Sequence, residues 1–337
     1  MNIAQTLEQL CTGTGVSGYE TAISKQVSDL LKPFCTNIQI LHGNVIGTVG
    51  THDPKKKHIL LDAHLDQVGM VVTYITEEGF VKVGAVGGLD LRLLPAQHVR
   101  LHGTHAIPGV ICTVPPHLMK GEETVPDWSA IYVDTGYSKE ELEHIISLGD
   151  CVSFDSPFQL LTEQCVSAPS LDDRCGIVAI LQAVEQLQNE TLPCNLTVLF
   201  SSQEELGERG AKIAAYQIHP DIALAVDVSF ARSHHDDPVK CGILGDGPMI
   251  GISPSLSRSV SEELIATAKA LNLPWQPEVM AGTTGTNADQ FSGTRNGIQT
   301  GTVSIPLRYM HTPSELIALK DVQATADLLA AYVRGSL

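Results

Sequence analysis

The feature that most constrains this fold is an alternation of apolar strands with amphipathic helices after residue 170. Apolar runs at 196–201, 222–228 and 298–305 predict buried strands. Helical spacing flanks and separates them, at 173–187, 211–217, 257–271 and 322–333. Because parallel strands need long crossover connections, usually helices, this alternation predicts an α/β fold with a mostly parallel sheet and helices on both faces.

The two ends of the chain belong to that sheet, and the middle does not. Helical spacing at 4–10 and 20–32 precedes a hairpin at 37–49 and an apolar strand at 58–63. Between about 70 and 160, short β runs are separated by turn residues, which predicts a small all-β, barrel-like module. We therefore expect a discontinuous α/β domain from residues 1–66 and 165–337, interrupted by a β-rich insert at 67–164.

Charge and cysteine content narrow the function. The chain has 21 basic and 38 acidic residues, a net charge of −17, which argues against binding nucleic acid or an anionic membrane surface. No apolar run approaches the 18 residues of a membrane span, and the first residues lack the basic and apolar pattern of a secretory signal. Eight scattered cysteines without a C-x-x-C pair indicate reduced thiols in a cytoplasmic protein.

Chemistry-bearing side chains follow the predicted strands. They are His64, Asp172, Glu205, Asp227 and His311. Taken singly, most have an ordinary explanation: a solvated histidine, a helix cap, or an acidic first turn that complements a helix dipole. Asp227 is harder to explain, because it interrupts an apolar strand and a buried carboxylate needs a partner.

Together these five side chains indicate a metal centre at one rim of the sheet. Two imidazoles and three carboxylates suit two divalent ions such as zinc, cobalt or manganese, bridged by one carboxylate. The neighbouring Glu204 then serves as general base. Asp66, two residues after His64, is placed to hold the other imidazole nitrogen of that histidine.

The spacing of these residues resembles that of a known family. The matching blocks are His64-x-Asp66-x-x-Gly69, Asp172-Asp173-Arg174-x-Gly176, Glu204-Glu205-x-Gly207-x-x-Gly210-Ala211, Asp227 and Pro306-x-Arg308-Tyr309-x-His311. They resemble the glutamyl and deblocking aminopeptidases, dinuclear metallopeptidases that assemble into tetrahedral shells. The resemblance covers nearly the whole chain, including Val86-Gly87-Gly88 in the insert and Gly285-Thr286-Asn287-Ala288 near the end.

This resemblance implies a role for each matching position. Asp172 bridges two metals, His64 and Asp227 complete one site, and Glu205 and His311 complete the other. Glu204 is the base, Asp66 orients His64, and Asp173 shapes the backbone beside Asp172. Asn287 stands where many relatives carry Asp, so it receives no catalytic role.

The resemblance also implies a reaction and an assembly. The implied reaction removes N-terminal amino acids from small peptides with a metal-activated water. The insert is implied to mediate dimerisation and higher assembly, usually into a hollow dodecamer.

Two other functions remain open from the sequence. A two-metal site of this kind also suits a deacylase or a carboxypeptidase-type amidohydrolase, and a peptide-binding shell protein would need no catalysis. The complete ligand set with Glu204 favours an enzyme. We interpret His98 and His102 as one face of a strand, and 234–237 (His-His-Asp-Asp) as a polar loop whose role stays open. Native metal, preferred N-terminal residue and oligomer size do not follow from the sequence.

Overall fold

A computed structural model describes residues 1–118, 125, 127–234 and 237–335 of the chain. Its centre is four parallel strands in the order β12 (Asn195–Ser201), β3 (His58–His64), β13 (Ile222–Phe230) and β16 (Gln299–Arg308). These are the apolar runs of the sequence, and both of their faces are buried. The expected α/β fold with a parallel sheet is confirmed for this centre.

Antiparallel pairs flank this centre, so the complete eleven-stranded sheet is mixed. On one side lie β1 (Asn37–Leu41) and β2 (Asn44–Val49), joined by a tight turn. The other strands are β17 (Glu315–Ala318), β11 (Cys165–Ala168), β10 (Gln159–Leu160), β14 (Met249–Ile252) and β15 (Gln276–Val279). Short connections give the antiparallel pairs β1–β2, β10–β11 and β16–β17, whereas β14 and β15, which are connected through a helix, pair parallel.

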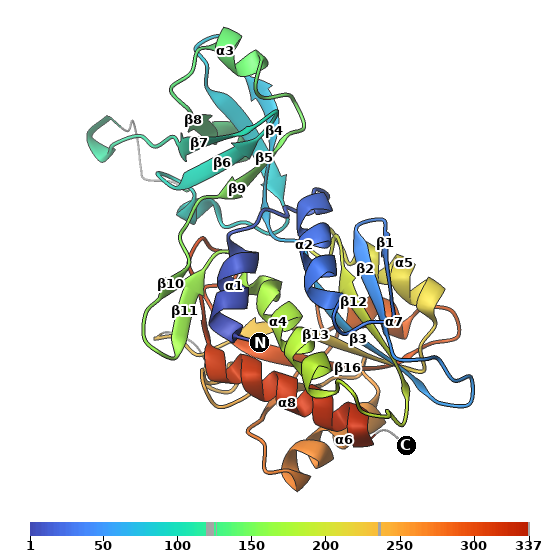
Figure 1. Cartoon of the computed structure of the whole chain (residues 1–337). Coiled ribbons are helices and arrows are strands. Elements are labelled where there is room, and N and C mark those ends of the chain that lie inside the picture. The colour runs from blue at the N-terminus through green and yellow to red at the C-terminus, as the bar shows by residue number, and fades with distance from the viewer. Residues whose placement is uncertain (119–124, 126, 235–236, 336–337) are drawn as a thin grey trace.

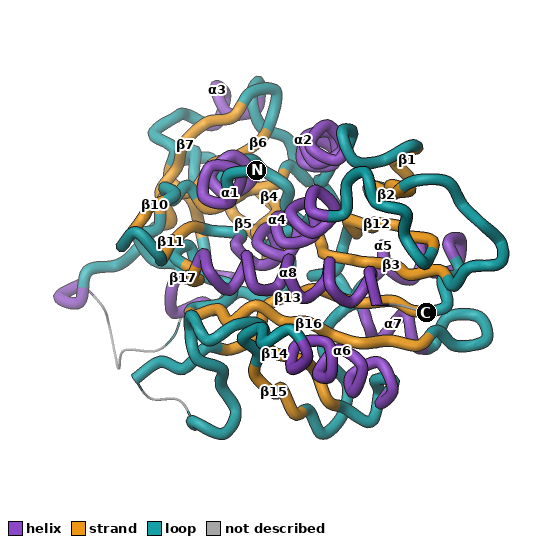
Figure 2. The backbone as a smooth tube through the Cα atoms, turned by 60° about the horizontal axis from the view of Figure 1, so that its bottom comes forward, coloured by secondary structure: helices purple, strands orange, loops and turns teal. Residues whose placement is uncertain are grey.

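Helices cover both faces of the sheet, as the sequence predicts. One face carries α1 (Ile3–Cys11), α2 (Thr21–Leu31), α4 (Leu171–Gln186), α6 (Arg258–Ala270) and α8 (Leu319–Gly335). The other carries α5 (Arg209–Ile218) and α7 (Ala288–Ser292). Strand residues alternate between the two cores, so Leu61 packs toward α4 and Leu60 toward α5. Figures 1 and 2 show α4 and α8 lying against the central strands.

The insert is a closed, antiparallel six-stranded barrel, which confirms the barrel-like module. Its strands, in spatial order, are β4 (Gly69–Ile75), β5 (Val81–Val86), β8 (Tyr132–Asp134), β7 (Ala106–Ile111), β6 (His98–His102) and β9 (Cys151–Phe154). The short helix α3 (Lys139–Glu143) lies at its outer end, and the barrel projects from one side of the sheet domain (Figure 1). Among the described residues, no helix is long and apolar enough to cross a bilayer.

Candidate metal centre

The five expected ligands meet where the central strands end. His64 is the last residue of β3, and Asp227 lies near the end of β13. The ladder between these two strands stops at Asp62 and Ala225, two residues earlier, so the strands no longer pair beside His64 and Asp227. Helix α4 packs across both strands and brings Asp172, at its start, to this opening. The site therefore lies beyond the carboxyl ends of parallel strands.

Asp172 stands between the two histidines. Its Oδ1 lies 2.9 Å from Nε2 of His64, and its Oδ2 lies 3.4 Å from Nε2 of His311. The side chain is buried, with 5% of its residue surface exposed. Each carboxylate oxygen thus faces a different imidazole, as a carboxylate shared by two neighbouring ions must.

The other two carboxylates divide between the histidines. Asp227 Oδ1 lies 4.0 Å from Nε2 of His64, and Glu205 Oε1 lies 3.3 Å from Nε2 of His311. Ligand atoms of Asp172, Glu205 and His311 all lie within 4.8 Å of one another. These distances bring all five residues together around Asp172, and ligand atoms of His64, Asp227 and Asp173 also lie within 4.8 Å of one another.

Backbone carbonyls set the orientation of both imidazoles. His64 Nδ1 lies 3.0 Å from the carbonyl oxygen of Asp66, and His311 Nδ1 lies 2.8 Å from that of Gly88. Because a carbonyl oxygen only accepts hydrogen bonds, each Nδ1 carries the proton. Each Nε2 then faces the carboxylates and, once it has lost its own proton, offers its lone pair to an ion there, which is the arrangement of a metal-binding histidine.

Asp66 holds the site in a different way from the one its spacing suggested. Its carboxylate lies 3.6 Å from His64 Nδ1, farther than its own backbone carbonyl. The two carboxylate oxygens instead accept the backbone N–H groups of Glu204 and Glu205, at 2.9 and 3.1 Å. Asp66 therefore ties the turn after β12 to the end of β3.

Glu315 supports the centre and was missed by the sequence reasoning. This buried side chain accepts the backbone N–H of His311 at 2.8 Å and that of Asp172 at 3.1 Å. It thereby connects the bridging position to one histidine. Its only signal in the sequence is a spacing of four residues from His311, which an exposed loop acid would share.

Asp173 and Asn287 lie next to the candidate ligands and form hydrogen bonds within the protein. Asp173 accepts the backbone N–H of Gly176 at 3.0 Å and that of His64 at 3.2 Å. The bond to Gly176 is the helix-capping contact that the sequence offered as the alternative to a site role. Asn287 donates through Nδ2 to Asp62 at 2.8 Å and to Ser201 at 2.7 Å, beneath the opening between the strands.

The metal-free cluster carries more carboxylates than bases. Burial and the neighbouring Asp227 and Glu205 raise the pKa of Glu204 to about 9. Burial and Asp172 raise the pKa of Asp227 to about 8. Burial alone would lower the pKa of His311, but its bonds to Asp172 and Glu205 raise it to about 11. Buried carboxylates at this density need cations, and the mixed N/O donor set fits zinc, cobalt or manganese.

The two histidines expected on one strand of the insert lie apart from this centre. His98 and His102 stand on barrel strand β6, as expected, where His102 Nε2 lies 2.9 Å from Ser153 Oγ. The loop at 234–237 falls partly outside the described residues, because 235–236 are not among them.

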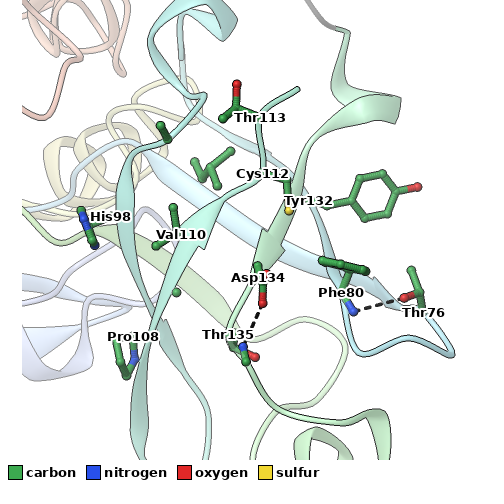
Figure 3. A pocket seen from close by; sticks show the side chains of 14 residues that line it. Thr76, Phe80, His98, Pro108, Val110, Cys112, Thr113, Tyr132, Asp134 and Thr135 are labelled. Carbon is green, nitrogen blue, oxygen red and sulfur yellow. Dashed lines mark hydrogen bonds between the residues drawn. The ribbon is translucent and has the colours of Figure 1, made fainter. Parts of the chain in front are cut away.

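Two cavities differ in their relation to the centre. One of about 560 Å³ adjoins it and is lined from β13, β15 and β16. A larger one, of about 990 Å³, lies on the barrel, where Phe80, Val110 and Tyr132 line it (Figure 3). The larger cavity is lined by insert residues alone, whereas the smaller one is lined by chain neighbours of two candidate ligands, Val228 beside Asp227 and Met310 beside His311.

Comparison with known proteins agrees with the resemblance expected from the sequence. The family model for M42 glutamyl aminopeptidase matches residues 43–328. A lysyl aminopeptidase of Pyrococcus furiosus is 33% identical over 98% of this chain and 96% of its own. An aminopeptidase structure from Desulfurococcus kamchatkensis superposes with a TM-score of 0.93 at 31% identity, covering 99% of this chain and 94% of that one.

A structure of the TET1 peptidase of Pyrococcus horikoshii superposes with a TM-score of 0.88 at 31% identity, covering 99% of this chain and 100% of that one. The expected resemblance, fold class and enzyme class are thus confirmed. The chain belongs to the M42 glutamyl aminopeptidase family and is a metal-dependent aminopeptidase.

Proposed function

We propose that this aminopeptidase works with two divalent ions, zinc, cobalt or manganese, shared by Asp172. The observation that carries the proposal is the placement of the two Asp172 oxygens, each facing the Nε2 atom of a different histidine. His64 and Asp227 would hold one ion, and Glu205 and His311 the other. When bound, such ions polarise a peptide carbonyl and make water a nucleophile near neutral pH.

Glu204 is the general base in this proposal. Ligand atoms of His64, Glu204 and Glu205 lie within 4.8 Å of one another, so the Glu204 carboxylate reaches the space between the ligands. It would take the proton of the attacking water and return it to the leaving amine. Asp66 holds the backbone of Glu204 in place through its carboxylate and orients His64 through its carbonyl.

Cleavage of matched peptides tests this proposal. One peptide pool, free and N-acetylated, is incubated with the cobalt- or zinc-loaded protein, and mass spectrometry follows the products. We expect stepwise N-terminal ladders from the free peptides alone, lost on chelation and in Glu204→Gln. Cleavage confined to acylated peptides would point to a deacylase, and intact peptides with full metal content would point to a binding protein.

The barrel insert is proposed to hold copies of this chain together, as a dodecamer. One of the similar solved structures is described as a dodecamer, and the P. horikoshii TET1 peptidase assembles into a tetrahedron or a large octahedral shell. In this chain, Phe80 and Val110 expose 37% and 38% of their surface around the barrel cavity. Native mass spectrometry would test the stoichiometry.

We propose a cytoplasmic location for the enzyme. All eight cysteines lie among the described residues, and none is joined to another by a disulfide. Fractionation of the source cells, followed by immunoblotting, would test this location.

A further inference from the structure

The cavity of about 560 Å³ is lined by chain neighbours of the proposed metal ligands. Two of its lining residues, Val228 and Met310, are the chain neighbours of Asp227 and His311. A peptide whose first carbonyl lies at the metal ligands would therefore place its first side chain in or beside this cavity. The chemistry of the lining then decides which N-terminal residue fits.

Glu278 of β15 supplies a carboxylate to this cavity. Its Oε2 accepts a hydrogen bond of 2.7 Å from Ser304 Oγ, and the Ser229 hydroxyl is a second partner. Both partners are neutral. Among the residues that the structure describes, no Lys, Arg or His nitrogen lies within ion-pair distance of Glu278.

The strand register fixes Glu278 relative to the metal ligands. Ser304 of β16 pairs directly with Asp227 of β13. The neighbours of Ser304, Val303 and Ile305, pack in the core on the α4 side, so Ser304 points to the opposite face, with Glu278. The Glu278 carboxylate is thus hydrogen-bonded to the residue that pairs with Asp227 in the sheet.

The remaining lining suits a long aliphatic side chain. Besides Glu278, the lining of the cavity includes Val228, Met249, Val279, Met280 and Met310. Methionines adapt their shape to methylene groups. A lysine or arginine side chain combines such an aliphatic stem with a terminal cation.

We infer that the first-residue pocket of this enzyme selects lysine or arginine, with Glu278 binding the side-chain cation. This inference rests on the proposed function, because it uses the metal centre to place the substrate. The family model carries the description glutamyl aminopeptidase, so the inference gives this chain a preference opposite in charge.

Lys240 also lines the cavity and would favour an acidic side chain instead. Lys240 is exposed, whereas Glu278 is half-buried with its oxygens held by serines. Exposed ion pairs contribute little because water and salt screen them. Burial raises the pKa of Glu278, and an incoming cation relieves that cost. The physical balance therefore favours Glu278 as the determinant.

The test compares lysyl, norleucyl and glutamyl amides of aminomethylcoumarin with the cobalt-loaded enzyme. Norleucine keeps the four-carbon stem of lysine and lacks the ammonium. We expect kcat/KM for the lysyl substrate to exceed that for the norleucyl substrate by about ten- to a hundredfold, the effect of one charged hydrogen bond. Glu278→Gln should bring the ratio near one, whereas Lys240→Gln and the matched surface control Glu262→Gln should leave it unchanged.

The results separate this inference from the proposed function. A lysyl-to-norleucyl ratio near or below one in the native enzyme, or a glutamyl preference lost in Lys240→Gln, would overturn the inference while leaving the aminopeptidase intact. If no amide is cleaved, the proposed function is in error. Calorimetry then decides the pocket: L-lysine binding metal-loaded Glu204→Gln at least about tenfold more tightly than L-norleucine supports it, and equal binding overturns it.

Discussion

The sheet and the insert barrel bury their side chains in opposite ways. Strand β13 is buried along nearly its whole length and still carries Asp227 near its end. Strand β7 alternates strictly, with Ile107 and Ile111 in the barrel core and Pro108 and Val110 facing outward. Alternating strands ordinarily turn polar residues to solvent. The barrel thus keeps its charges out and leaves apolar groups exposed, while the sheet buries charges at one rim.

This difference separates the roles of the two regions. All the described groups of side chains that could hold a metal belong to the sheet domain. The barrel contributes one contact to them, the carbonyl of Gly88, which accepts the Nδ1 proton of His311. The candidate metal centre therefore belongs to the sheet, and the barrel supports one of its histidines and exposes apolar side chains.

We expect the largest loss of metal binding and activity when the carboxylate shared by the two proposed ion sites is removed. In Asp172→Ala both ion sites lose a ligand, so we expect metal content to fall and kcat/KM to drop about 10³-fold, equivalent to roughly 4 kcal/mol of lost transition-state stabilisation. Metal analysis by mass spectrometry and peptide hydrolysis measure the two effects.

The matched control for this change is Asp134→Ala, which removes a carboxylate from the barrel. It should leave metal content and hydrolysis unchanged. Full metal occupancy in Asp172→Ala would show that Asp172 is not the shared ligand.

Metal affinity should rise steeply with pH. At pH 7 the metal-free chain holds protons on Glu204, Asp227 and His311, whose pKa values are raised to about 9, 8 and 11. Ions bind only deprotonated ligands, so each proton displaced makes the affinity fall about tenfold per unit decrease in pH. Calorimetry in buffers of different ionisation enthalpy counts the protons released. A pH-independent affinity between pH 6 and 8 would refute this account of the cluster.

Glu315→Gln tests whether Glu315 positions the metal ligands without binding the metal itself. Glutamine keeps one carbonyl acceptor for the two N–H groups of Asp172 and His311 that Glu315 now accepts. We expect metal affinity to fall about 10- to 100-fold, as for other partners behind metal ligands. Saturating cobalt should restore most of the activity, which would not happen if Glu315 reacted directly with substrate.

The smallest effect on chemistry should come from the barrel surface. Val110→Asp places a charge on the outward face of β7, so we expect native mass spectrometry to show smaller assemblies while short-peptide hydrolysis changes less than about threefold. Leu160→Asp, on the exposed sheet strand β10, is the matched control and should leave the assembly intact. Unchanged assembly in Val110→Asp would remove this face from the interface.

The sequence predicted the central strands and the convergence of the five candidate ligands for one physical reason. Each central strand is a continuous apolar run, and parallel strands end at the same rim, so polar residues such as His64 and Asp227 at those ends must converge. The marginal strands β14, β15 and β17 were not predicted. They are only four residues long, and tertiary pairing rather than local pattern determines them.

The missed site residues belong to those same margins. Glu315 begins β17, and Glu278 lies on β15. In the sequence both look like ordinary surface acids that follow a proline or a serine, Pro277 and Ser314. Their positions depend on which strand pairs with β16, and hydrophobic periodicity does not determine that pairing.

Anomalous diffraction from crystals of the cobalt- or zinc-loaded protein tests whether two ions share the Asp172 carboxylate. We expect two peaks at the metal's absorption edge, on opposite sides of the Asp172 carboxylate. One should lie beside His64 and Asp227, and the other beside His311 and Glu205. A single peak, or peaks that do not contact Asp172, would contradict this expectation.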